Sequence, residues 1–147
     1  MKTVVSNLPT RAIISLGSNI EPREEYLAKA REKIAQFPET RIHAVSSVIE
    51  TEPVDVRPED QERLFLNQVL VVMTSLDVDF FFDLLCAVED ALGRKRTGYH
   101  SPRTIDLDLI DFGGLIRTDA NLILPHPRAK ERAFVMEPLK ELGIEFK

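Results

Sequence analysis

The hydrophobic periodicity of this chain changes several times, and the order of the changes restricts the folds that it can adopt. Residues 12–19, AIISLGSN, form a short apolar run stopped by glycine and asparagine, which predicts a central strand. A helical spacing of apolar residues then runs over 22–37, with Pro22 in the first turn and Pro38 ending it. The chain therefore begins with a strand followed by a helix.

The next segments predict two strands and a second helix. Residues 41–51 and 64–74 are rich in β-branched side chains and are separated by a polar, proline-containing stretch at 52–63. Apolar residues at helical spacing over 77–92 predict a helix, and Gly93 is placed to end it in the left-handed conformation. A connection as long as 52–63 exceeds what a hairpin needs, and such loops are typically either functional or disordered.

A last strand is predicted at 105–109, where Ile105, Leu107 and Leu109 alternate with Asp106 and Asp108. The order β-α-β-β-α-β predicts an α+β fold, a ferredoxin-like sandwich in which both helices cover one face of an antiparallel sheet. Beyond residue 114 a short apolar segment and a final helical stretch form a C-terminal extension whose packing the pattern leaves open. We expect one domain over residues 1–147.

Composition restricts the cellular compartment and the classes of partner that we expect for this chain. A single cysteine, Cys86, excludes an intramolecular disulfide and favours a reducing compartment. No signal-peptide pattern or bilayer-length apolar run is present, so we expect a cytoplasmic protein without a membrane partner. The net charge of -5 argues against a nucleic-acid partner, because such binding depends on clustered Lys and Arg.

The acidic strand and the basic segment before it together indicate a phosphate ligand. Side chains at i and i+2 of a strand share a face, so Asp106 and Asp108 stand roughly 6–7 Å apart at their backbones. Four cations, Arg94, Lys95, Arg96 and Arg103, lie within the ten positions 94–103 shortly before these acids. Arginine binds phosphate oxygens bidentately, and paired carboxylates without zinc-type Cys or His spacing favour Mg²⁺. The pattern predicts a polyphosphate held with its metal.

Each of these features also has a simpler explanation. A lone pair of strand aspartates often only meets lysines of a neighbouring strand, and a basic loop is often a solvated turn. Asn67 could be a core amide bonded to the backbone, and His126, between two prolines, could be a packed turn residue. Only the combination of acids, arginines, an amide and a histidine favours a binding site.

The chain resembles a known family. The segment SPRTIDLDLI (101–110) is similar to the motif of the 6-hydroxymethyl-7,8-dihydropterin pyrophosphokinases, which is Gly-Pro-Arg-Thr, an aliphatic residue, and Asp-aliphatic-Asp. Further pieces follow in the family's order, from about Ala12 to Leu142: SLGSN, SSVIETEPV, FLNQVL, VEDALGR and LPHPRAKERAFVMEPL. The resemblance implies transfer of pyrophosphate from ATP to a reduced pterin, with release of AMP, in folate biosynthesis.

The resemblance also implies roles for individual residues. Asp106 and Asp108 match the carboxylates that bind two Mg²⁺ ions, and Arg94 and Arg103 match catalytic-loop arginines. ATP contacts are implied for Cys86, Glu89, Arg103, His126 and Arg132. Pterin contacts are implied for Thr51, Val54, Phe65, Asn67 and Phe134, with Asn67 reading the ring edge and the two phenylalanines sandwiching it. The implied partners are small-molecule substrates and other folate-pathway enzymes.

The sequence departs from the commonest family pattern at a few positions. His100 and Ser101 stand where tryptophan and glycine often precede Pro-Arg, Glu52 stands where proline is frequent, and Cys86 replaces a polar residue. These departures concern the loop and the nucleotide contacts and leave Asp106 and Asp108 of the motif unchanged. Two other classes remain open: a ferredoxin-like module that binds nucleotide or pterin without turnover, and an RNA-binding sheet, which the acidic strand disfavours.

Overall fold

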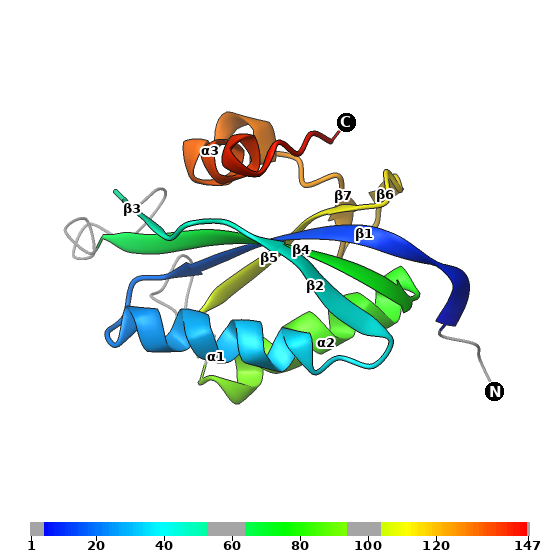
Figure 1. The fold of residues 1–147 in the computed structure, drawn as a ribbon, viewed down its shortest axis with the longest axis horizontal. Helices are drawn as coiled ribbons and strands as arrows, with labels where there is room; N and C mark the ends of the chain where they lie inside the picture. The colour runs from blue at the N-terminus through cyan, green and yellow to red at the C-terminus, as the bar shows by residue number, and fades with distance from the viewer. Residues whose placement is uncertain (1–4, 53–63, 94–103, 147) are drawn as a thin grey trace.

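An antiparallel sheet forms the middle layer of the computed structural model, with helices on both of its sides (Figure 1). The structure describes residues 5–52, 64–93 and 104–146. The main layer and its first two helices are, in chain order, β1 (Val5–Ser18), α1 (Arg23–Ala35), β2 (Thr40–Val45), β3 (Ile49–Thr51), β4 (Phe65–Leu76), α2 (Val78–Ala91) and β5 (Asp106–Phe112). The remaining elements are β6 (Arg117–Thr118), β7 (Ile123–Leu124), the 3-10 turn η2 (Ala129–Glu131) and α3 (Ala133–Leu142).

The strand order in the main sheet is β2-β4-β1-β5, and the short strand β3 also pairs with β4. All of these pairings are antiparallel. The sequence prediction of an antiparallel sheet with helices, in the order strand, helix, two strand segments, helix and strand, is confirmed. The strands β1 and β4 are central and the most extensively paired. Interstrand hydrogen bonds therefore hold their backbones, and the side chains on them, firmly in position.

Three boundaries differ from the sequence prediction. The first strand begins at Val5 rather than at residue 12, because its start pairs with the end of β4 at Leu76. The segment 41–51 is not one strand but two, β2 and β3, because Ser46 leaves the strand path between them and bonds to Val69 through both its backbone N–H and its side-chain hydroxyl. Pro22 caps α1 instead of lying inside its first turn.

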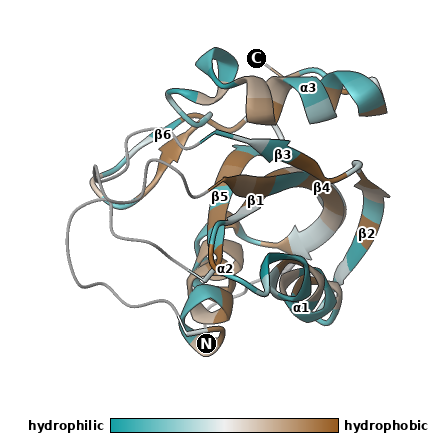
Figure 2. Ribbon diagram, turned by 90° about the vertical axis from the view of Figure 1, so that its left-hand side faces the viewer, coloured by the Kyte–Doolittle hydropathy of each residue, from teal (hydrophilic) through white to brown (hydrophobic). Residues whose placement is uncertain are grey.

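Two apolar layers lie on the two faces of the sheet. One joins β1, β4 and β5 to α1 and α2, and includes Ile14, Leu70 and Phe81. The other joins the opposite face to α3, and includes Ile13, Val71 and Leu139. Figure 2 shows the hydrophobic colour gathered on these central strands. The final helix, whose packing the sequence left open, therefore covers the face of the sheet that α1 and α2 leave uncovered.

The ends of α2 follow the sequence pattern. Asp77 caps the helix by accepting a hydrogen bond from the Phe80 N–H at 2.9 Å. Gly93 follows the last turn with a φ of 92°, which confirms the predicted left-handed position. Within the described ranges, none of the helices combines the length and apolar character that crossing a bilayer requires.

Candidate active site

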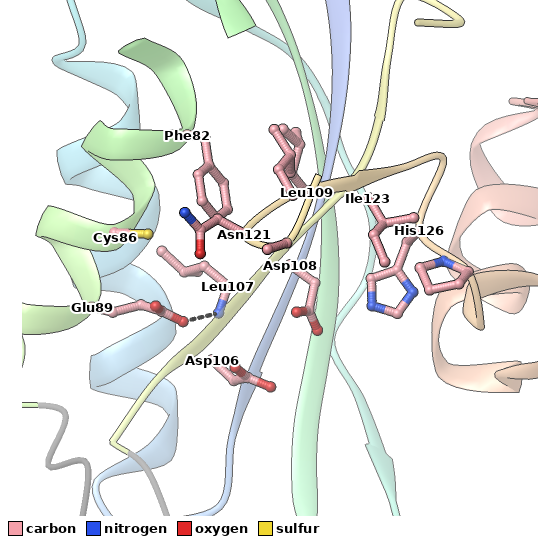
Figure 3. Close-up of a pocket in the computed structure, with 13 residues that line it drawn as sticks. Phe82, Cys86, Glu89, Asp106, Leu107, Asp108, Leu109, Asn121, Ile123 and His126 are labelled. Atoms are coloured by element: carbon pink, nitrogen blue, oxygen red, sulfur yellow. Dashed lines mark hydrogen bonds between the residues drawn. The ribbon is translucent and has the colours of Figure 1, made fainter. Parts of the chain in front are cut away.

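The two aspartates of β5 lie on the face of the sheet that α3 covers. Leu107 and Leu109 are buried in the apolar layer under α1 and α2. Because side chains alternate along a strand, Asp106 and Asp108 point to the opposite face, where both remain partly exposed. Figure 3 shows the two carboxylates side by side at one cavity. The geometry thus places two acids together, as the sequence predicted.

A cavity of about 370 Å³ opens beside these carboxylates (Figure 3). Its walls come from α2 (Phe82, Cys86 and Glu89), from residues 106–109 of β5, and from residues 120–123, His126 and Pro127. The wall toward α2 is mixed apolar and polar, whereas the wall toward β5 is acidic. This volume and lining suit a small organic ligand that carries a charged group at one end.

Glu89 connects α2 to the strand between the two aspartates. It is 3% exposed, and its Oε2 accepts a hydrogen bond from the Leu107 N–H at 2.8 Å (Figure 3). Leu107 pairs with Leu16 of β1 on its other side, so Glu89 satisfies a backbone donor on the outer edge of β5. The residue predicted to contact ATP therefore lines the cavity and also fixes the strand that carries Asp106 and Asp108.

Arg132 supplies positive charge beside Asp108. Its Nη1 lies 4.0 Å from Asp108 Oδ2, and its guanidinium lies 5.5 Å from the centre of the Phe134 ring. Its Nε is buried and has no hydrogen-bond partner among the residues that the structure describes. A buried donor without a partner costs free energy unless a ligand uses it, and an anionic oxygen is a suitable acceptor.

The donor set fits a hard divalent ion. Within residues 5–52, 64–93 and 104–146, no group of three or more His, Cys, Asp and Glu side chains is arranged to hold a metal. A metal at Asp106 and Asp108 would therefore have one or two carboxylates from the described chain and would need further oxygen ligands. Mg²⁺ binds in this way, with water and phosphate oxygens completing its shell.

His126 enters the cavity from the segment after β7. Burial lowers the pKa of its imidazole below the ordinary value of 6.5; Arg132 and Arg128 lower the pKa further, and Asp106 opposes them. Its Nδ1 accepts a hydrogen bond from the Arg128 N–H at 3.2 Å, which requires that this nitrogen carry no proton. The imidazole is therefore neutral at physiological pH and lies near Asp108 (Figure 3).

The lowered pKa predicts a pH-dependent loss of stability in the protein without ligands. The folded state resists protonation of His126, while the unfolded chain protonates near pH 6.5, so this contribution is present above pH 6.5 and is lost as the pH falls toward the folded-state pKa. His126→Asn is expected to lose less unfolding free energy between pH 7.5 and 5.5 than the wild type. Denaturant titrations at both pH values measure this difference, with the exposed His43→Asn as control. An equal pH dependence in wild type and His126→Asn would contradict the prediction.

A second group of predicted residues lies on the same face, at β3 and β4. Asn67 is 3% exposed and its Nδ2 donates to Thr51 Oγ1 at 2.5 Å. Phe65 lies two positions before Asn67 on β4 and so points to the same face. The structure brings these three residues together, and the amide is held by a side chain rather than by the backbone.

The wall formed by β3 and β4 is joined to the start of α1 by Arg23. Its Nη1 donates to Glu50 Oε2 at 2.9 Å and to the Leu64 carbonyl at 3.0 Å. Glu50 and Leu64 immediately precede Thr51 and Phe65, so one guanidinium fixes the ends of both strands. The wall is therefore held in place from outside the sheet.

Phe134 lies at the start of α3 and packs against the apolar layer on that side. The predicted sandwich of a pterin ring between Phe134 and Phe65 stays a prediction. Three other predicted residues, Val54, Arg94 and Arg103, lie outside the described residues. Cys86 lines the cavity, with its sulfur toward the other lining side chains (Figure 3), and its predicted contact with ATP stays a prediction.

Sequence reasoning missed part of the cavity wall. Phe82 lies one helical turn before Cys86 on the same face of α2, so the helical period could have identified it. Asn121 comes from the turn between β6 and β7, and Ile123 is the first residue of β7. No local pattern relates that segment to α2, because their proximity depends on the path of the chain after β5.

Comparison with known proteins identifies the family of this chain. Residues 13–144 match the model of the 7,8-dihydro-6-hydroxymethylpterin-pyrophosphokinase family. A 2-amino-4-hydroxy-6-hydroxymethyldihydropteridine pyrophosphokinase of Bacillus subtilis is 42% identical over 131 residues, which are 89% of this chain and 77% of that protein. The enzyme of the same name from Methylorubrum extorquens is 38% identical over 134 residues, which are 91% of this chain and 83% of that protein.

Solved structures show the same fold at much lower identity. The wild-type HPPK-DHPS of Plasmodium falciparum, crystallised with pterin and p-hydroxybenzoate, superposes with a TM-score of 0.71 at 14% identity and covers 97% of this chain. This chain spans only 41% of that solved protein, so the match concerns one part of it. The match of the family model over most of the chain, with relatives near 40% identity, carries the conclusion. The chain belongs to the 7,8-dihydro-6-hydroxymethylpterin-pyrophosphokinase family.

Proposed function

We propose that this protein transfers pyrophosphate from ATP to the hydroxymethyl group of 6-hydroxymethyl-7,8-dihydropterin, giving the pterin diphosphate and AMP in folate biosynthesis. The observation that carries the proposal is the position of Asp106 and Asp108 in a chain of this family. They lie between a cavity that suits a nucleotide and the buried amide of Asn67, which suits a pterin.

ATP is proposed to occupy the cavity with its base toward α2 and its phosphates toward β5. Cys86 and Glu89 line the α2 end, and His126 lines the β5 end, where the Arg132 guanidinium lies beside Asp108. Arg94 and Arg103 are proposed to add phosphate contacts, on the basis of the family motif alone. This orientation puts the positive charge of the site where the triphosphate needs it.

The pterin is proposed to bind over β4, with its edge on Asn67 and Thr51 and its ring between Phe65 and Phe134. Val54 would complete these contacts. A neutral amide offers both a donor and an acceptor to a heterocycle edge, and an aromatic face suits a planar ring. The link of Asn67 to Thr51 fixes which way the amide is turned.

In the proposed reaction the pterin hydroxyl releases its proton to water and its oxygen forms a bond to the β-phosphorus of ATP, while the bond from that phosphorus to the oxygen bridging to the α-phosphorus breaks. AMP leaves with that oxygen. Asp106 and Asp108 would hold two Mg²⁺ ions, which when bound neutralise charge on the phosphates. The side chains of the two binding regions would orient the two substrates. Such positioning supplies much of the lowering of the activation barrier in enzymatic phosphoryl transfer.

The proposal extends to the fold type, the cellular location and the partners of this protein. The strand order and the helices suggest a ferredoxin-like βαββαβ core with β6, β7 and α3 as a C-terminal extension, within one domain. We propose a cytoplasmic location, where ATP is available, and other folate-pathway enzymes as partners. A bifunctional protein FolKE of Lactococcus lactis, 38% identical over 129 residues, gives one example of a family member fused to a second activity.

The test is an assay of the purified protein with 6-hydroxymethyl-7,8-dihydropterin, ATP and Mg²⁺, following AMP and the pterin product. Equal amounts of AMP and pterin diphosphate are expected, and EDTA should stop their formation. Release of ADP would instead indicate ordinary phosphoryl transfer. Tight binding of both substrates without product would favour a binding module.

A further inference from the structure

Gly17 occupies the centre of the sheet between the two halves of the site. It pairs with Asn67 of β4 on one side and with Asp106 of β5 on the other. Residues directly opposite each other on antiparallel strands point to the same face, so position 17 lies in one row between the amide and the first carboxylate. The row lies on the α3 side, because Val69 and Val71, the next residues on the Asn67 face of β4, belong to that apolar layer.

The backbone of Gly17 does not require glycine. It is not among the residues with positive φ, which include Gly93, Gly113, Gly114 and Gly143 in the described part of the chain. Glycine inside a strand costs roughly 0.5–1 kcal/mol relative to alanine, and it often marks a position that a ligand approaches closely. The reason for glycine here is therefore the space above the strand.

That space is already taken by the residues of the proposed pterin wall. A Cβ atom at position 17 would lie 3.1 Å from Asn67 Oδ1 and 3.6 Å from Phe65 Cδ1. The first distance is too short for a comfortable contact, and the amide cannot swing away freely because its Nδ2 is bonded to Thr51. Even the smallest side chain would require the Asn67 amide to shift by a few tenths of an ångström.

We propose that Gly17 is a positioning residue for the pterin: its bare backbone lets the Asn67 amide and the Phe65 ring approach β1 closely, at the residue that pairs with Asp106. The inference rests on the proposed function. Gly17 acts through Asn67, so a side chain here disturbs pterin binding and leaves the nucleotide cavity unchanged. Among the described residues, Gly17, Phe65 and Asn67 are not part of the cavity walls.

The test compares the full-length wild type with Gly17→Ala in the pyrophosphokinase assay. KM for the pterin is expected to rise about tenfold or more, while KM for ATP changes less than twofold. A pterin KM equal to that of the wild type would overturn the inference, and so would equal increases for both substrates, since these indicate a general structural effect. A wild type that makes no pterin diphosphate would overturn the proposed function itself, which separates the two failures.

A double variant tests whether the effect passes through Asn67. In an Asn67→Ala background the closest contact is gone, so adding Gly17→Ala should change kcat/KM for the pterin less than twofold. Effects that multiply independently would contradict the inference. If Gly17→Ala alone does not fold, the double variant should fold, because the crowded amide has been removed; failure of both to fold would refute the steric explanation.

Discussion

Asp106→Ala and Asp108→Ala are each expected to lower kcat at least about 1000-fold while the protein keeps its fold. Both carboxylates point into the cavity from β5, and neither belongs to the apolar layers of the core. A bound metal ion stabilises the charge of the transition state by several kcal/mol, and about 4 kcal/mol corresponds to three powers of ten in rate. Steady-state kinetics with saturating Mg²⁺ measure the effect, and circular dichroism with thermal unfolding checks the fold.

Asp83→Ala is the matched control for these two variants. Asp83 is an exposed acid on α2 and does not line the cavity. Its removal changes the net charge by the same amount and should leave kcat within twofold. Full activity in both Asp106→Ala and Asp108→Ala would remove the metal assignment from β5.

Glu89→Ala is expected to have the second largest effect, on both stability and nucleotide binding. The change leaves the buried Leu107 N–H without its acceptor, which costs about 1–3 kcal/mol of unfolding free energy. It also releases β5 between Asp106 and Asp108 and opens the α2 wall of the cavity, so KM for ATP should rise about tenfold. Denaturant titration and initial-rate kinetics measure the two effects.

Glu89→Gln separates the hydrogen bond from the charge. The glutamine carbonyl oxygen has the same reach and can still accept from Leu107, so most of the stability should return. If Glu89→Gln is as unstable as Glu89→Ala, the bond to Leu107 is not the cause. If Glu89→Ala is as stable as the wild type, this connection between α2 and β5 contributes little.

The main elements of the fold could be predicted because their hydrophobic patterns are local. The alternation at Ile105, Leu107 and Leu109 identifies β5 without any distant contact, and the helical spacing that ends at Gly93 identifies α2. The break between β2 and β3 could not be predicted in this way. It depends on Ser46, which bonds to Val69, and residues 46 and 69 meet only after β4 has paired.

The site was predictable to a different extent on its two sides. Asp106 and Asp108 follow from strand alternation, and Asn67 and Phe65 share a strand face by the same rule. The wall formed by Asn121 and Ile123 depends on how the chain returns across β5 after the sheet is complete. The proposed role of Gly17 could not be predicted either, because the reason for a buried glycine depends on its neighbours on both adjacent strands.

The cavity joins two parts of the molecule that differ greatly in how firmly their backbones are held. Its acidic wall is on β5, which pairs along β1 in the centre of the sheet, whereas the opposite wall includes a hairpin with only the pairs Arg117 with Leu124 and Thr118 with Ile123. Local opening starts where few backbone hydrogen bonds must break, so amide hydrogens of β6 and β7 should exchange with solvent long before those that bond between β1 and β5. The hairpin wall of the cavity can therefore fluctuate while Asp106 and Asp108 on the opposite wall keep their geometry.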